Sequence, residues 1–192
     1  MKILIFAFLV LVFFPFLMIQ SFSVGEEELR GIDTKPLVGH LAAWNYFMSV
    51  KTPENKAFIK KWNAYVKKNK LPGGSKRVTN DPMEATYIGI KMWAQAVKQA
   101  GTTNVDAVRQ AIGGQTVQSP SGFNITMDAK NHHLHKPVVI GEITEDGQFE
   151  IVWQTDGPIR ADAWSPFIPD SKERVADWTY PWLCGNCTEA KE

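Results

Sequence analysis

The hydrophobic pattern of this chain changes its period near residue 120, which limits the folds open to it. Before that point apolar residues recur at helical spacing, whereas residues 123–127 alternate between apolar and polar, as in a half-buried strand. An Asp-Gly turn at 145–147 then separates two apolar runs, 138–144 and 149–153, which is typical of an antiparallel hairpin. The pattern predicts an α/β fold, with an open, mostly parallel sheet flanked by helices and an antiparallel hairpin at its edge.

Several helices have clear boundary signals. A capping residue followed by proline predicts helix starts at Thr52 and at Asp81, and glycine ends the second helix at Gly101. A third helix is expected from Asn104 to Ile112. Ser23 and Glu26 stand in capping-box spacing and predict one more helix start, and residues 37–47 are expected to form a strand that runs into a loop.

The overall composition is that of a folded protein with no bulk attraction to polyanions. The chain of 192 residues is 44% apolar and 21% charged, and its formal net charge is +1. Lys and Arg are scattered along the sequence without a basic stripe interleaved with aromatic residues, so nucleic-acid binding is not expected. A Gly-rich phosphate loop, a nucleophile elbow and a catalytic triad are all missing from the sequence, which favours a binding protein over an enzyme and predicts no cofactor.

The N-terminal segment 1–20 is the exception to this soluble character. After Lys2 the chain is apolar from Ile3 to Ile19, interrupted only by Pro15. The segment fits a secretory signal peptide, a membrane tether through residues 3–19, or, over residues 16–24, a buried parallel strand. The rest divides into a lobe over 21–155 and a Pro- and Trp-rich extended tail over 156–192.

Polar and aromatic side chains follow the predicted strands and are candidates for ligand contacts. Glu26 and Glu27 stand where a strand meets a helix, at the edge of an α/β sheet where ligands commonly bind. Their alternative role is to favour a helix N-terminus by their charge. Trp44, Asn45 and Tyr46 follow the next strand and suit a small planar solute, or else core packing and a turn.

Tyr87 completes the set of candidate ligand residues. It lies in the first turns of the helix that begins at Asp81, where its hydroxyl group would face a cleft or remain half buried.

Two other groups invite a metal or redox interpretation. His132, His133 and His135 are close in sequence, but adjacent residues of a strand alternate faces, so no metal site is expected. Cys184 and Cys187 lack the second pair of a zinc finger and are expected to form a local disulfide if the chain is exported.

Blocks of sequence in matching order resemble the urea and short-chain amide group of bacterial type I solute-binding proteins. They are Ser-Phe-Ser-Val-Gly-Glu-Glu-Glu-Leu-Arg-Gly-Ile from Ser21, then Gly39–Phe47, Asn80–Tyr87, Asn131–Pro137, Gly157–Arg160 and Trp164–Pro169. The resemblance runs from about residue 16 to near the end of the chain.

The resemblance implies an extracytoplasmic receptor for urea or a short-chain amide. Such a receptor closes on its ligand between two lobes and delivers it to the membrane permease subunits of an ABC transporter. Toward urea, Glu26 or Glu27 would accept hydrogen bonds from the amide groups and Asn45 would donate or accept. The aromatic candidates Trp44, Tyr46 and Tyr87 would supply walls or a hydroxyl group.

The match begins inside the family's length, so the chain is interpreted as the C-terminal lobe of a truncated receptor. The missing N-terminal lobe would then be its partner, and the chain alone would bind urea very weakly, because closure between lobes creates the affinity. Two alternatives stay open, an amide-sensing regulatory protein of the same fold and a gene fragment without present function.

Overall fold

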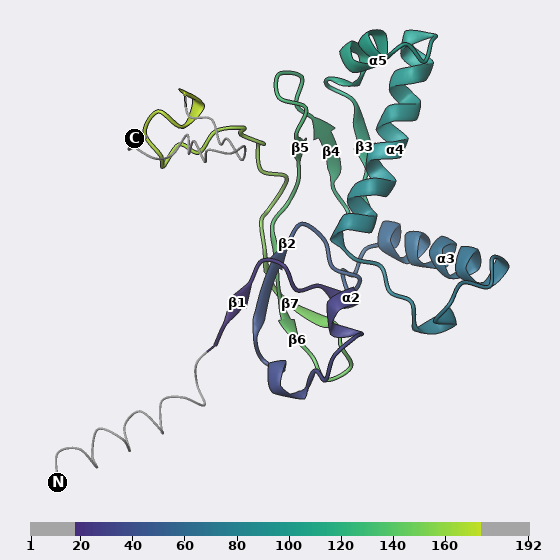
Figure 1. Cartoon of the computed structure of the whole chain (residues 1–192), viewed down its shortest axis with the longest axis vertical. Helices are drawn as coiled ribbons and strands as arrows, with labels where there is room; N and C mark the ends of the chain where they lie inside the picture. Colours follow the sequence, from purple (N-terminus) through teal and green to yellow (C-terminus); the bar gives the residue numbers. More distant parts are fainter. Residues whose placement is uncertain (1–17, 174–192) are drawn as a thin grey trace, which may run out of the picture.

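The computed structural model describes residues 18–173, which form short and long helices around two sheets (Figure 1). The helices are α2 (Glu26–Leu29), α3 (Pro53–Lys68), α4 (Asp81–Ala100) and α5 (Val105–Ile112), with 3₁₀ turns η2 (Lys35–Leu37), η3 (Gly74–Lys76) and η4 (Ser171–Glu173). The strands are β1 (Gln20–Ser21), β2 (Leu41–Trp44), β3 (Thr116–Gln118), β4 (Asn124–Met127), β5 (Leu134–His135), β6 (Val139–Ile143) and β7 (Phe149–Gln154).

The three longer helices begin within one residue of the predicted positions. The Thr52 hydroxyl accepts a hydrogen bond from the peptide N–H of Asn55 at 3.0 Å and caps α3. The cap of α4 is Asn80, not the expected Asp81, because the Asn80 side chain accepts from the peptide N–H of Met83 at 3.2 Å. Gly101 ends α4 with φ +66°, a left-handed conformation that glycine adopts without strain.

The predicted capping box at Ser23 and Glu26 is wrong by two residues. Gly25 is the residue before α2, and its peptide N–H donates to the Glu28 carboxylate at 2.9 Å. Glu28 therefore takes the role expected of Glu26. This shift leaves the Glu26 side chain free to turn inward, where it is buried.

The strands of the described residues form two sheets. Sheet A has the order β1-β2-β6-β7, in which β1 and β2 are parallel and the other pairs antiparallel. Sheet B has the antiparallel order β3-β4-β5. The α/β class and the β6–β7 hairpin are as predicted. The expectation of a mostly parallel sheet is wrong for the described residues, where only β1 and β2 pair in parallel, because the chain leaves sheet A after β2 and returns as β6 in the opposite direction.

Strand β1 falls within the segment predicted as a parallel strand over residues 16–24. It pairs parallel to β2, with Gln20 opposite Leu41. Its flanks are exposed, however, with Met18, Ile19 and Phe22 at 59%, 55% and 73%. The expectation of a buried strand is therefore wrong for the described residues.

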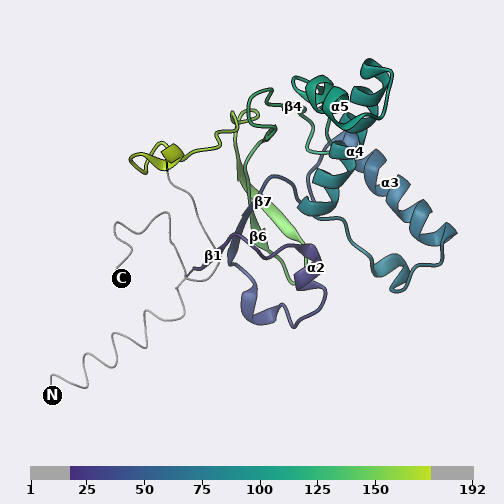
Figure 2. The same ribbon diagram turned by 45° about the horizontal axis from the view of Figure 1, so that its top comes forward.

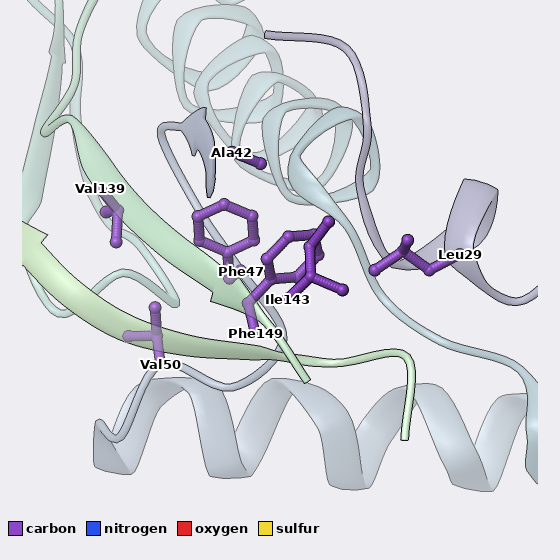
Figure 3. Close-up of a cluster of buried hydrophobic side chains, with 7 residues drawn as sticks. All are labelled: Leu29, Ala42, Phe47, Val50, Val139, Ile143 and Phe149. Carbon is purple, nitrogen blue, oxygen red and sulfur yellow. The ribbon is translucent and has the colours of Figure 1, made fainter. Parts of the chain in front are cut away.

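Each sheet has its own apolar cluster. Figure 3 shows the cluster on sheet A, where the rings of Phe47 and Phe149 lie 4.3 Å apart and are surrounded by Leu29, Ala42, Val50, Val139 and Ile143. A Cβ on Gly141 would lie 2.8 Å from Phe149 and 3.1 Å from the Phe47 ring, so close packing here requires glycine. The second cluster joins α4 to sheet B through Ile88, Met92, Val117 and Ile125.

The chain crosses between the two sheets at a narrow junction (Figures 1 and 2). One crossing joins β5 to β6 through residues 136–138, and the start of the tail runs beside it, since the Ile159 N–H donates to the Lys136 carbonyl at 2.9 Å. The polar groups at this junction include several of the candidate residues, which are described below.

Two expectations fall outside the described residues. Most of the apolar segment 3–19 lies there, as does the proposed disulfide between Cys184 and Cys187. Within residues 18–173, none of the helices combines the length and hydropathy needed to cross a bilayer.

Candidate functional site

A small cavity lies where β1 and β2 end and the helices α2 and α4 begin. Its volume is about 40 Å³. Eight residues line it, namely Ser23, Gly25, Glu26, Glu28, Trp44, Asn80, Asp81 and Pro82. Because a water molecule occupies about 30 Å³ in the liquid, this recess accommodates one small polar group.

Glu26 is the most unusual residue of the cavity. Its side chain is 1% exposed, and its Oε1 accepts a hydrogen bond from the peptide N–H of Met48. Its Oε2 is also buried and accepts no hydrogen bond from any residue that the structure describes. A buried acceptor of this kind is costly to the fold unless another group satisfies it.

Burial changes the protonation of Glu26. Removal from water raises the pKa of its carboxyl group to about 7, and the charges of Asp81 and Glu28 act in the same direction. The hydrogen bond from Met48 opposes the rise but does not cancel it. Glu26 therefore exchanges its proton near neutral pH, which is a common property of binding and catalytic carboxylates.

The indole of Trp44 forms one wall of the cavity and is held in place from behind. Its Nε1 donates to the Val24 carbonyl at 2.8 Å, which fixes the ring beside Gly25. The face of the indole ring therefore lines the cavity, whereas its Nε1–H group is already bonded to Val24 and is not free to bind a ligand. The sequence-based pairing of Glu26 and Trp44 in one site is thus reproduced in space.

Asp81 connects the cavity to a buried network of charges. Its Oδ1 accepts from Lys136 Nζ at 3.2 Å, and the same lysine donates to Glu84 Oε2 at 2.8 Å. The other oxygen of Glu84 accepts from the Ser119 hydroxyl. Lys136 and Glu84 are 9% and 0% exposed, and each has an oppositely charged partner within the protein.

Asn45 belongs to the rim of this network. Its peptide N–H donates to Asp81 Oδ1 at 3.2 Å, and its side-chain amide donates to the Pro137 carbonyl at 2.7 Å. Both contacts fasten the end of β2 to the junction between the sheets. Asn45 thus positions Asp81, and the nitrogen of its side-chain amide is already engaged.

The two candidate tyrosines lie away from the cavity, in an aromatic row between α3 and α4. Tyr46 is fully buried, and its hydroxyl donates to Asn55 Oδ1 at 2.7 Å and lies 2.8 Å from Thr79 Oγ1. Burial raises the pKa of Tyr46 well above its ordinary value. Phe58 packs against Tyr46, and its ring lies 4.8 Å from that of Tyr87, which is half buried.

Glu27 points in the opposite direction from Glu26. It pairs with Arg30 one helical turn away, and 40% of its side chain is exposed. The sequence did not separate the two neighbouring acids, since both stand in the first turn of α2. The sequence analysis also missed Asp81 and Lys136. Asp81 was assigned to the start of a helix, and Lys136 lies beside the histidine cluster, so neither position called for a ligand.

The histidine cluster contains one ion pair and no recognisable metal site. His135 Nε2 lies 3.1 Å from Asp128 Oδ2. Backbone N–H groups, first that of Lys130, lower the pKa of Asp128, and His135 adds to this effect. No group of three or more potential metal ligands occurs within residues 18–173.

A larger open groove of about 1110 Å³ lies along β7 and the start of α3. Residues 49–52, 121–123 and 144–154 contribute to its walls. Its walls contain no strongly buried charged group, in contrast to the small cavity at Glu26. We therefore place the candidate site at Glu26.

A comparison with protein families assigns this chain to one of them. The sequence pattern of the family described as periplasmic binding protein domain matches residues 16–170. A limonene hydroxylase of Geobacillus stearothermophilus is 35% identical over 148 residues, which make up 77% of this chain and 26% of that protein.

Solved structures show the same fold. A solute-binding protein of an ABC transporter from Rhodopseudomonas palustris, in complex with p-hydroxybenzoic acid, gives a TM-score of 0.59 at 22% identity, covering 74% of this chain and 38% of that one. An amino acid ABC transporter substrate-binding protein from Pseudomonas fluorescens gives 0.59 at 21% identity, covering 76% and 38%. The chain spans little more than a third of these structures. Because the family pattern covers most of its length, the chain belongs to the periplasmic binding protein domain family.

Proposed function

We propose that this chain is the ligand-capturing part of an extracytoplasmic solute-binding component of an ABC transporter, and that its ligand is urea or a short-chain amide. The observation that carries the proposal is the buried, unpartnered Oε2 of Glu26, a residue that lines the cavity together with Trp44. The family is one of ligand-binding domains, which supports capture of a solute rather than catalysis.

The chemistry of the cavity favours a ligand that donates hydrogen bonds. Its walls include the carboxylates of Glu26, Glu28 and Asp81 and contain no lysine or arginine among the described lining residues. An amide N–H would satisfy Glu26 Oε2, and the Trp44 ring would cover one face of a planar amide. A carboxylate ligand would face three acidic groups, which makes this site a poor fit for the aromatic acid in the R. palustris complex.

The size of the recess supports a small ligand that a second surface completes. A volume of about 40 Å³ encloses a single amide group, and the remainder of the ligand would face outward. Because one side of the site provides only part of the contacts, we expect weak binding by this chain alone. Full affinity would require the rest of a two-lobed receptor, and delivery would require transporter subunits at the membrane.

The test is a titration followed by NMR on the indole Nε1–H signal of Trp44, assigned with the Trp44→Phe variant. Urea and acetamide, added below denaturing concentrations, are expected to shift this signal, and benzoate is not. The Glu26→Leu variant should lose the response. Glu27→Gln is the matched control, because Glu27 is the neighbouring acid on the same helix but points to solvent.

Two results would count against the proposal. Benzoate shifting the Trp44 signal more than urea would assign the site to acids. An undiminished urea response in Glu26→Leu would remove Glu26 from the site.

A further inference from the structure

The net charge of this chain is nearly neutral, but its basic and acidic residues are unevenly distributed along the sequence. Residues 51–77 hold nine of the 21 basic residues and a single acid, Glu54. The remaining 165 residues hold twelve basic and nineteen acidic residues. The basic segment consists of α3 with its flanking turns, so the description of Lys and Arg as scattered along the sequence is wrong for residues 51–77.

The lysines of α3 share one face of the helix. At about 100° per residue, Lys56, Lys60, Lys61, Lys67 and Lys68 fall within about 140° of its circumference. The buried residues Asn55, Phe58 and Val66 lie on the opposite side. All five lysines are exposed, and none forms an ion pair with a residue that the structure describes.

One exposed aromatic ring borders this basic face, and a second ring lies behind it. Tyr65 is 55% exposed, and its ring stacks on that of Trp62 with centroids 6.0 Å apart and an angle of 17° between the planes. A tyrosine ring, with an apolar body and a polar tip, suits the boundary between water and lipid headgroups. Lys70, Lys76 and Arg77 extend the positive charge past the end of the helix.

The helix is also placed to meet a broad surface. Figures 1 and 2 show α3 running outward from the junction of the sheets, with its far end and the η3 turn at the periphery of the molecule. The face that carries the lysines lies opposite the side of α3 that holds its buried residues.

We propose that the basic face of α3 docks on an anionic lipid bilayer. Eight of the nine basic residues of the segment are lysines, which act as hydrated point charges and suit diffuse attraction to many headgroups. Recognition of individual phosphates or of nucleic acid relies more on the fork of arginine. This inference does not depend on the ligand proposed for the Glu26 cavity, which lies on other elements.

The experiment is co-sedimentation of the full chain with vesicles of phosphatidylcholine and phosphatidylglycerol at three to one, compared with pure phosphatidylcholine. Binding to the anionic vesicles is expected to be at least about tenfold tighter at low salt and to fall to the neutral level in about 0.5 M NaCl. The apolar segment Ile3–Ile19 would give a background that does not depend on headgroup charge, so the difference between the two vesicle types is the readout.

The test variant is Lys56→Glu/Lys60→Glu/Lys67→Glu, and it should lose at least about tenfold of the charge-dependent binding. The control, Lys98→Glu/Lys130→Glu/Lys172→Glu, changes the net charge equally at exposed positions outside the face and should stay within about threefold of the original chain. A milder variant, Lys56→Gln/Lys60→Gln/Lys67→Gln, gives an intermediate loss and covers the case that the first does not fold.

The proposal is overturned if the control triple loses as much binding as the test triple, because overall charge would then be the cause. It is also overturned if the two vesicle types bind equally. Absence of vesicle binding together with tight, salt-sensitive binding to RNA or to an acidic protein would assign the face to another class of partner.

Discussion

Glu26 and Glu84 are both almost completely buried, yet their surroundings differ in kind. Glu84 is held by Lys136 and by the Ser119 hydroxyl, so both of its oxygens have donors. Glu26 has one donor, the peptide N–H of Met48, and its second oxygen has none among the described residues. The comparison separates a carboxylate that stabilises the junction between the sheets from one that we propose binds a ligand.

The largest effect is expected at the partnered glutamate. Lys136→Met would leave Glu84 and Asp81 without their shared cation, and should lower the free energy of unfolding by about 3–5 kcal/mol. Guanidinium denaturation measures the change, since urea is the proposed ligand. Lys130→Met, at an exposed lysine on the β4–β5 turn, is the control and should change stability by less than about 0.5 kcal/mol. A loss below about 1 kcal/mol for Lys136→Met would show that the network contributes little.

The unpartnered glutamate, Glu26, should make the free energy of unfolding depend on pH. Because the pKa of Glu26 is raised from 4.5 to about 7 in the folded chain, its contribution to stability is complete below pH 4.5 and is lost as pH rises through 7. Glu26→Gln does not titrate, so its stability relative to the original chain should increase from pH 4.5 to pH 8, by up to about 3 kcal/mol. Guanidinium denaturation across this range measures the difference, and a constant difference between the two proteins would contradict the shifted pKa.

A third change tests whether a buried neutral group, the Tyr46 hydroxyl, also stabilises the fold through its hydrogen-bond partners. Tyr46→Phe removes the hydroxyl that joins Asn55 to Thr79 and leaves both without that partner. The expected loss is about 1–3 kcal/mol, smaller than for Lys136→Met because no charge is left unpaired. Thermal unfolding is a sufficient measurement, and Tyr65→Phe, on the exposed side of α3, is the control. Equal effects at both tyrosines would remove burial as the explanation.

The smallest effect is expected at the cap of the helix that carries Glu84. Asn80→Ala removes the acceptor for the Met83 N–H and should cost about 1 kcal/mol. Since Asn80 also lines the cavity of Glu26, the same variant shows whether the two regions are coupled. An unchanged urea response of the Trp44 signal would mean that Asn80 serves the helix alone, whereas a lost response would extend the site to α4.

Local signals in the sequence predicted the helices well and the partners of buried groups poorly. Thr52 and Gly101 mark helix ends because a cap depends on residues within one turn. The same reasoning did not identify the partner of Glu84, Lys136, which lies more than fifty positions away in the sequence. A contact between residues far apart in the sequence produces no local pattern, so the buried network could not be predicted from sequence patterns.

The candidate site was predicted in part for the same reason. Glu26 and Trp44 follow neighbouring strands, so the rule that ligands bind at strand ends brought them together correctly in space. It could not distinguish Glu26 from Glu27, because only the position of the first residue of α2 decides which acid faces inward. The division of the strands between two sheets was likewise invisible, since strand pairing is set by tertiary packing.

The pairing of β2 with β6 has a consequence for how the chain acquires its structure. Leu41 lies opposite Glu142, so sheet A can close only after about a hundred intervening residues have been ordered or synthesised. Sheet B, α4 and α5 are built from neighbouring segments and can form during that interval. The molecule should therefore fold from its middle outward, and the edge of β2 that pairs with β6 stays unpaired until that strand is in place. A slow refolding phase that reports on Trp44 and Trp153, but not on Trp93 of α4, would be the kinetic trace of this order.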